Sequence, residues 1–155
     1  MIHIKKILYS TDFSSYSNQA YFHAVALAEH HRASLTIVFV YTPDLAVPGK
    51  TEATTSRRYW QDQLEQIHPL NPDIPVRHVF LEGDPATEIV RYARDAGMDL
   101  IVMGTHGRTG LDRLLMGSVA EKVMREALCS VLVVKLPKGM PTPSRADAEV
   151  AAGSV

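Results

Sequence analysis

Short apolar runs alternate with longer segments in which apolar residues recur at helical spacing. The apolar runs predict five strands, at Ile4–Ser10, Ser34–Tyr41, Val76–Leu81, Leu100–Met103 and Val131–Lys135. The segments between them predict helices over Ser14–His31, Thr54–Ile67, 84–97 and Ser118–Leu128. Strands that alternate with helices in this way are typical of an α/β domain with a doubly wound, mostly parallel sheet.

The helix predicted over 84–97 has the clearest end signals. Asp84 suits the N-cap, and Pro85 suits the first helical position, where its missing N–H costs nothing. Gly97 is placed to end the helix. The predicted apolar stripe consists of Ala86, Ile89, Val90 and Ala93.

After residue 136 the periodicity stops and the chain becomes rich in Pro, Ala, Ser and Gly. We expect residues 1–136 to form one domain and residues 137–155 to form a mobile tail. The length and the 46% hydrophobic content suit a single domain with a sizeable core.

Composition excludes several classes of protein. The formal net charge of −1 leaves no basic footprint for nucleic acid or for an anionic membrane. No apolar run approaches the ~20 residues of a membrane span, and the N-terminus does not resemble a signal peptide. The single cysteine, Cys129, cannot form an internal disulfide. We therefore expect a cytoplasmic protein.

A glycine-rich segment joins the fourth predicted strand to the last predicted helix. Its glycines include Gly104, Gly107 and Gly117, and Ser118 follows directly. Glycine tolerates positive φ and allows a ligand to approach the backbone, while a helix N-terminus attracts phosphate. The spacing matches neither the Walker A pattern nor the dinucleotide-binding Gly-x-Gly-x-x-Gly. It predicts a phosphate-binding loop of another kind.

The spacing Gly-x2-Gly-x9-Gly-Ser resembles the ATP-binding branch of the universal stress protein family. The first predicted strand, with Asp12 after it, extends the resemblance to residues 2–136. The resemblance implies a Rossmann-like fold with strand order 3-2-1-4-5. Asp12 and Gly104 would then follow neighbouring strands and face one crevice at the point where the strand order reverses.

The resemblance also implies roles for individual residues. Asp12 would bind the adenosine part of ATP, and the backbone of Val40 would bind the adenine edge. The phosphates would lie on Gly107, Gly117 and Ser118, and would carry a Mg²⁺ ion rather than place it in a protein cage. The complete implied set is Asp12, Val40, Met103, Gly104, Gly107, Gly117, Ser118 and Val119. One departure is Ser10, which stands where the family commonly has proline.

Other interpretations of these residues remain open. Ser118 and Glu121 have the spacing of a capping box, in which the serine would cap the last helix. Asp12 could simply be the N-cap of the helix that follows it. His106 and Arg108 could contact phosphate or be solvated loop residues.

The function implied by the resemblance is that of an ATP-binding stress-response protein, a nucleotide-dependent regulatory module with an unknown protein partner. The alternative is a slow or partner-stimulated ATP hydrolase, although no Walker lysine is present. A phospho-acceptor receiver domain shares the five-stranded plan. Its chemistry needs an acidic cluster at the strand ends, and the third predicted strand ends in Leu81-Glu-Gly without an aspartate.

The last predicted strand, Val131–Lys135, would lie at a sheet edge in the order 3-2-1-4-5. It is short, apolar and free of proline, and such an edge is a template for pairing. We expect two copies of the chain to pair through it as a homodimer, the arrangement that the resemblance also implies.

Overall fold

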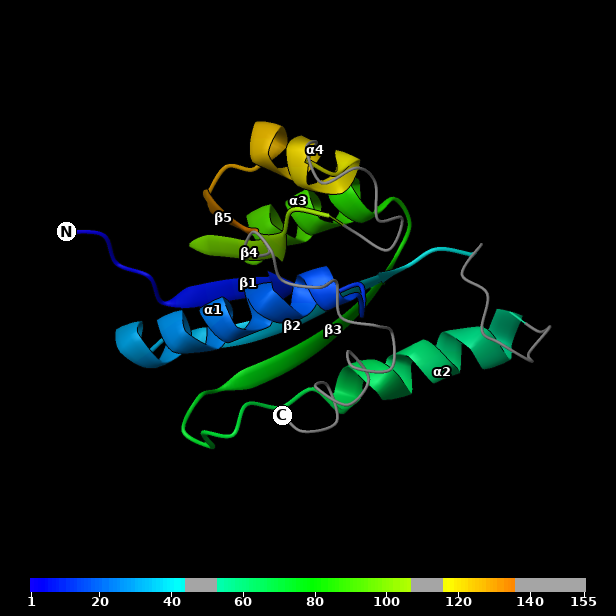
Figure 1. Ribbon diagram of the computed structural model, residues 1–155, viewed down its shortest axis with the longest axis horizontal. Coiled ribbons are helices and arrows are strands. Elements are labelled where there is room, and N and C mark those ends of the chain that lie inside the picture. The colour runs from blue at the N-terminus through cyan, green and yellow to red at the C-terminus, as the bar shows by residue number, and fades with distance from the viewer. Residues whose placement is uncertain (44–52, 107–115, 136–155) are drawn as a thin grey trace.

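The computed structural model describes residues 1–43, 53–106 and 116–135 (Figure 1). The expected tail at 137–155 and the loop residues Gly107 and Arg108 lie outside the described residues. None of the helices in the described ranges is long and apolar enough to cross a membrane.

Five parallel strands form one sheet in the order β3-β2-β1-β4-β5, which confirms the expected order. The central strand β1 pairs with β2 on one side and with β4 on the other. The strands are β1 (Lys6–Ser10), β2 (Ser34–Tyr41), β3 (Val76–Glu82), β4 (Leu100–Gly104) and β5 (Ser130–Val134).

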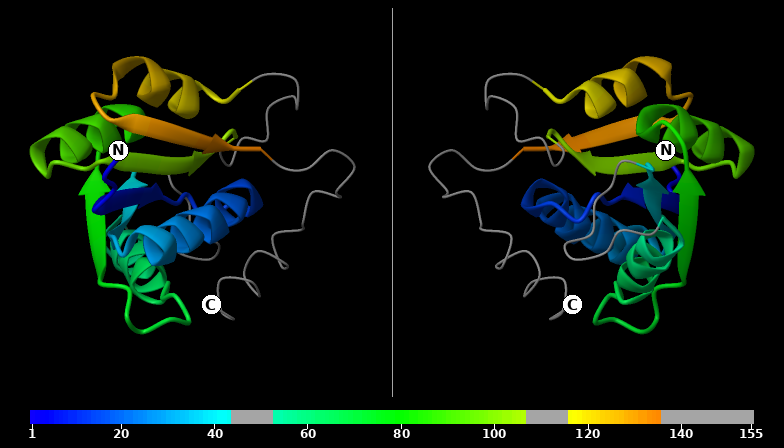
Figure 2. Two further views of the ribbon diagram at one scale, coloured as in Figure 1. Left: turned by 90° about the vertical axis from the view of Figure 1, so that its left-hand side faces the viewer. Right: turned by 90° about the vertical axis from the view of Figure 1, so that its right-hand side faces the viewer.

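In the described ranges, four helices connect the strands and cover both faces of the sheet, as Figure 2 shows. Along β1, Ile7 and Tyr9 pack into the core under α1 and α2, whereas Leu8 packs into the core under α3 and α4. This alternation follows from the two-residue period of a strand. The helices are α1 (Ser15–His31), α2 (Ala53–Glu65), α3 (Pro85–Asp95) and α4 (Ser118–Glu126).

Helix α1 lies close against the sheet because small residues separate them. Ala20, Ala24 and Ala28 are buried on its inner face. At the end of β4, a Cβ built on Gly104 would lie 2.8 Å from the backbone oxygen of Tyr16. Gly104 is therefore required by helix packing, whatever else this position does.

The ends of α3 confirm the sequence prediction. The Asp84 carboxylate accepts a hydrogen bond from the Thr87 N–H (3.0 Å), and Pro85 begins the helix. At the other end Gly97 has a φ of +66°, the left-handed conformation that commonly follows a helix.

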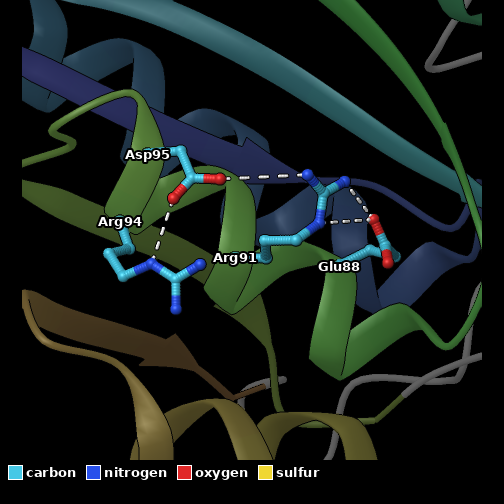
Figure 3. A network of polar contacts seen from close by, with 4 residues as sticks. All are labelled: Glu88, Arg91, Arg94 and Asp95. Atoms are coloured by element: carbon cyan, nitrogen blue, oxygen red, sulfur yellow. Dashed lines mark hydrogen bonds and ion pairs between the residues drawn. The ribbon is translucent and has the colours of Figure 1, made fainter.

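The outer face of α3 carries a network of ion pairs within this one helix (Figure 3). Arg91 bonds to Glu88 and lies 3.9 Å from Asp95, whose carboxylate also accepts from Arg94 (3.0 Å). The arginine side chains are about half exposed. Exposed pairs of this kind contribute little stability, so the network is a feature of the surface of α3 and not what holds the helix to the sheet.

Candidate functional site

A cavity of about 320 Å³ opens at the carboxyl ends of β1, β2 and β4. The N-terminal ends of α3 and α4 also reach it, through Pro85 and through Gly117 and Ser118. From β1 the chain continues into a helix on one face of the sheet, and from β4 it continues into a helix on the other face. The cavity lies between these two strand ends, the place where open α/β sheets bind ligands. Its volume is in the range of small-molecule sites.

The described residues of the expected site all line this one cavity. They come from the ends of three strands and the start of one helix, and they are Asp12, Val40, Met103, Gly104, Gly117, Ser118 and Val119. Gly107 is the member of the set that lies outside the described residues. The structure therefore brings together residues more than a hundred positions apart in the chain.

Asp12 is held in a tight turn directly after β1. Its Oδ1 accepts a hydrogen bond from the Ser14 N–H (2.9 Å). Ser14, not Asp12, is the N-cap of α1, and its Oγ accepts from the Ser17 N–H (3.4 Å). The interpretation of Asp12 as an N-cap is therefore wrong: the carboxylate orders the turn and lines the cavity.

The backbone of Val40 faces the cavity for a reason of strand geometry. On the β1 side of β2, the Val38 carbonyl accepts from the Thr11 N–H (2.9 Å); on the β3 side, the Tyr41 carbonyl accepts from the Gly83 N–H (3.1 Å). Residues two positions apart in a strand direct their backbone N–H and C=O groups to the same side. The backbone groups of Val40 therefore point toward the β1 side, as those of Val38 do. Because β1 has already ended there, they point into the cavity that Val40 lines.

The N-terminus of α4 is capped differently from the prediction. Gly117 occupies the N-cap position, without a side-chain hydrogen bond, and the first intrahelical bond runs from the Glu121 N–H to the Gly117 carbonyl (3.0 Å). The capping box is therefore wrong, because Ser118 already lies inside the helix. The N–H groups of Ser118, Val119 and Ala120 precede the first intrahelical bond, and these three residues line the cavity.

Gly117 does not use the positive φ that glycine tolerates. Its φ of −61° and ψ of 152° are extended values that any residue can adopt. Its N–H donates to the Thr105 carbonyl (2.7 Å) and is not available to a ligand. The absence of a side chain at the cavity is what distinguishes glycine at this position.

Thr105 was not singled out by the motif, although it lines the cavity and is 6% exposed. Its N–H donates to the Val134 carbonyl (3.1 Å), so it ties the loop base to the end of β5. Its Oγ1 lies 3.0 Å from Nδ1 of His106, whose ring packs against Tyr16. A polar residue directly after a buried apolar strand was the available signal.

Other residues that line the cavity were also absent from the predicted site, some with the same available signal as Thr105 and some with none. Thr11 and Thr42 follow β1 and β2, as Thr105 follows β4. Ser17 and Ile89 are placed by the packing of α1 and α3, and nothing local in the sequence marks them as cavity residues. Hydroxyl groups therefore surround much of an otherwise apolar cavity.

Charge is unevenly distributed around the cavity. Among the described lining residues the ionisable side chains are Asp12, at the end of β1, and His106, after β4. The first turn of α4 contributes partial positive charge through its unpaired N–H groups. No cluster of three metal-ligating side chains occurs in the described part of the chain. The arrangement suits a ligand with a polar end near Asp12 and an anionic end near α4.

The chain belongs to the universal stress protein family, whose model matches residues 3–135. It is 39% identical over 142 residues to universal stress protein MJ0531 of Methanocaldococcus jannaschii, covering 86% of this chain and 84% of the relative. It is 34% identical over 135 residues to a universal stress protein of Thermus aquaticus, covering 84% and 98%.

Solved structures share the fold. Hypothetical protein MJ0577 superposes with a TM-score of 0.66 at 28% identity, over 90% of this chain and all of that one. Universal stress protein UspA of Lactobacillus plantarum gives a TM-score of 0.69 at 24% identity, over 85% and 98%. A universal stress protein solved in complex with cAMP gives 0.62 at 24% identity, over 87% and 99%.

Proposed function

We propose that the cavity binds an adenine nucleotide, ATP with Mg²⁺, and that the protein is a nucleotide-dependent regulatory module of the cytoplasm. The observation that carries this proposal is the start of α4: a helix N-terminus without a side-chain cap opens onto the same cavity as Asp12. A helix end of this kind favours phosphate. A carboxylate in the same cavity suits the hydroxyl groups of a ribose.

The chain offers a group for each part of the nucleotide. The outward-facing backbone of Val40 is suited to the adenine edge, and Met103 and Val119 supply apolar walls. The N–H groups of residues 118–120 and the Ser118 hydroxyl are suited to the phosphates. A magnesium ion on the phosphates would neutralise part of their charge without needing a protein cage.

The test is calorimetric titration of the protein with ATP–Mg²⁺, AMP and cAMP. We expect ATP to bind to the wild type and to fail to bind to Gly117→Val. Valine tolerates the extended φ and ψ of residue 117, so the variant folds, but its side chain stands at the cavity. Equal ATP affinity in the two proteins would refute the assignment of the site.

We expect this nucleotide to be bound rather than turned over. Phosphoryl transfer needs positioned charge around the transferred group. The lining residues within the described ranges include neither lysine nor arginine. Turnover should therefore stay well below the ~1 s⁻¹ at the low end of typical enzymes. Phosphate release that Gly117→Val abolishes would favour the hydrolase instead.

We also propose that two copies pair through β5, which forms one edge of the sheet. Beside it, Met124 and Leu128 are 50% and 82% exposed, so apolar side chains extend the edge. Pairing would cover both features about a twofold axis. Sedimentation equilibrium should find a dimer at micromolar concentration, and a monomer there would exclude this arrangement.

A further inference from the structure

Phe13 has an unusual backbone conformation directly beside the cavity. Its φ of 62° lies in the left-handed region, which a bulky side chain rarely adopts. The residue immediately precedes Ser14, whose N–H bonds to Asp12, and its own N–H donates to Thr11 Oγ1 (3.0 Å). The conformation of Phe13 therefore defines the turn that holds Asp12 at the cavity.

An aromatic cluster on the face of the sheet that α1 and α2 cover holds this conformation in place. The Phe13 ring lies 4.9 Å from the ring of Phe39 on β2 and 5.3 Å from that of Trp60 on α2. The contact with Trp60 is stacked, with an interplanar angle of 25°. Phe39 and Trp60 are themselves buried. Strained backbone of this kind persists only where its surroundings hold it.

We propose that Phe13 is a positioning residue for nucleotide binding: its ring, stacked on Trp60, holds the Asp12 turn in its binding geometry. The inference rests on the proposed function. It has a second consequence, because the same residue joins the cavity to α2. A ligand that contacts Asp12 shifts the turn, and the shift reaches the stacked Trp60 ring. Helix α2 thus senses whether the cavity is occupied.

The chain provides its own reporter of this coupling, because Trp60 is its single tryptophan. The first measurement is the emission of Trp60 in the wild type during a titration with ATP–Mg²⁺, excited selectively over tyrosine. We expect emission to change with the same midpoint that calorimetry gives. Emission that stays constant while calorimetry reports saturation would overturn the coupling and leave the proposed function intact.

The second measurement compares two matched variants, Phe13→Leu and Phe80→Leu. Phe80 belongs to the same aromatic cluster, 5.7 Å from Phe39 and 5.9 Å from Tyr41. Unlike Phe13, which follows Asp12, it is not adjacent in the chain to a residue that lines the cavity. Both variants lose one ring, so both should lower stability. Only Phe13→Leu should also lower ATP affinity, by about tenfold, because a misplaced carboxylate loses much of one charged hydrogen bond.

Phe13→Tyr keeps the ring and should restore both the affinity and the emission change. Equal ATP affinity in Phe13→Leu and Phe80→Leu would overturn the positioning role. If Phe13→Leu does not fold, the wild-type emission titration still tests the proposal, because constant Trp60 emission at saturation would overturn it. Wild-type protein that binds no ATP in calorimetry would instead refute the proposed function, and this inference with it.

Discussion

Two neighbouring helices on one face of the sheet begin in opposite ways. At α3 the Asp84 carboxylate accepts from the Thr87 N–H and Oγ1, and Lys122 reaches across from α4 to the same carboxylate (3.3 Å). At α4 the N-cap is Gly117, which has no side chain to offer. Both helices start beside the cavity. The start of α3 is capped by the side chain of its own N-cap residue, whereas the start of α4 presents its N–H groups to the cavity.

The backbone does not cause this difference. The N-cap residues of α3 and α4 have similar extended conformations, with φ of −74° and −61° and ψ of 122° and 152°. A carboxylate at position 117 could therefore cap α4 as Asp84 caps α3. Its absence costs stability but keeps a positive helix end open. The comparison shows that the side chain at the N-cap, and not the backbone, decides whether a helix start presents its N–H groups to the cavity.

The largest effect should come from making the two helix starts alike. Gly117→Asp should stabilise the protein by a few tenths of a kcal/mol, because aspartate is a better N-cap than glycine. It should lower ATP affinity by at least about 100-fold, because the carboxylate occupies the N–H groups and repels phosphate. Urea denaturation and calorimetry measure the two effects.

Gly117→Asn is the matched control, since asparagine caps without charge and should lower affinity less. Stability that rises together with unchanged ATP affinity in Gly117→Asp would show that the α4 start does not bind phosphate.

The next effect separates a packing glycine from a cavity glycine. Gly104→Ala should lower the free energy of unfolding by about 1–3 kcal/mol, because its Cβ would press on the Tyr16 backbone. Gly117→Ala, at extended φ, should cost less, about 0.5 kcal/mol, because alanine is a poorer N-cap than glycine. Urea denaturation of both variants checks the pair, and equal stabilities would contradict the packing argument.

Removing the cap of α3 should give a pH-dependent loss. Asp84→Ala should cost about 1 kcal/mol of stability at pH 7 with little change in ATP affinity. Hydrogen bonds from the Thr87 side chain and backbone, and then Lys122, lower the pKa of Asp84. A lowered folded pKa stabilises the protein above the ordinary value of about 3.9, and this contribution is lost as pH falls through the folded value.

The difference between wild type and Asp84→Ala should therefore be constant from pH 7 to about pH 5 and disappear at lower pH. Asp84→Asn retains a good cap and should remain close to the wild type at pH 7. A difference that grows on acidification would contradict the sign of the pKa shift.

The smallest effect comes from comparing two serines near helix starts, Ser14, which is an N-cap, and Ser118, which is not. Ser118→Ala should leave stability unchanged, because Ser118 is not the N-cap, and lower ATP affinity about fivefold. Ser14→Ala should do the reverse and cost about 1 kcal/mol of stability, because Ser14 caps α1. If Ser118→Ala also destabilises the protein, α4 depends on the serine after all.

Much of the fold follows from local pattern. The elements predicted from periodicity match those observed within a few residues, because each strand and helix buries one face or both in a regular repeat. The start of α3 is correct because its cap is local: Asp84 bonds to Thr87 three residues later and Pro85 begins the helix, and Lys122 of α4 only adds to this cap. The strand order required the family resemblance, since periodicity does not say which strands are neighbours.

The sequence by itself determined the alternation of strands and helices, the cap of α3 and the glycines that mark the loop. Tertiary structure decided which residues share the cavity: Thr42 and Ile89 meet the motif residues only because β1 and β4 are neighbours. Tertiary structure also decided that Gly117, and not Ser118 as predicted, is the N-cap of α4. The Gly117 N–H donates to the Thr105 carbonyl at the other end of the loop. A cap depends on the path of the chain entering the helix, and long-range contacts set that path.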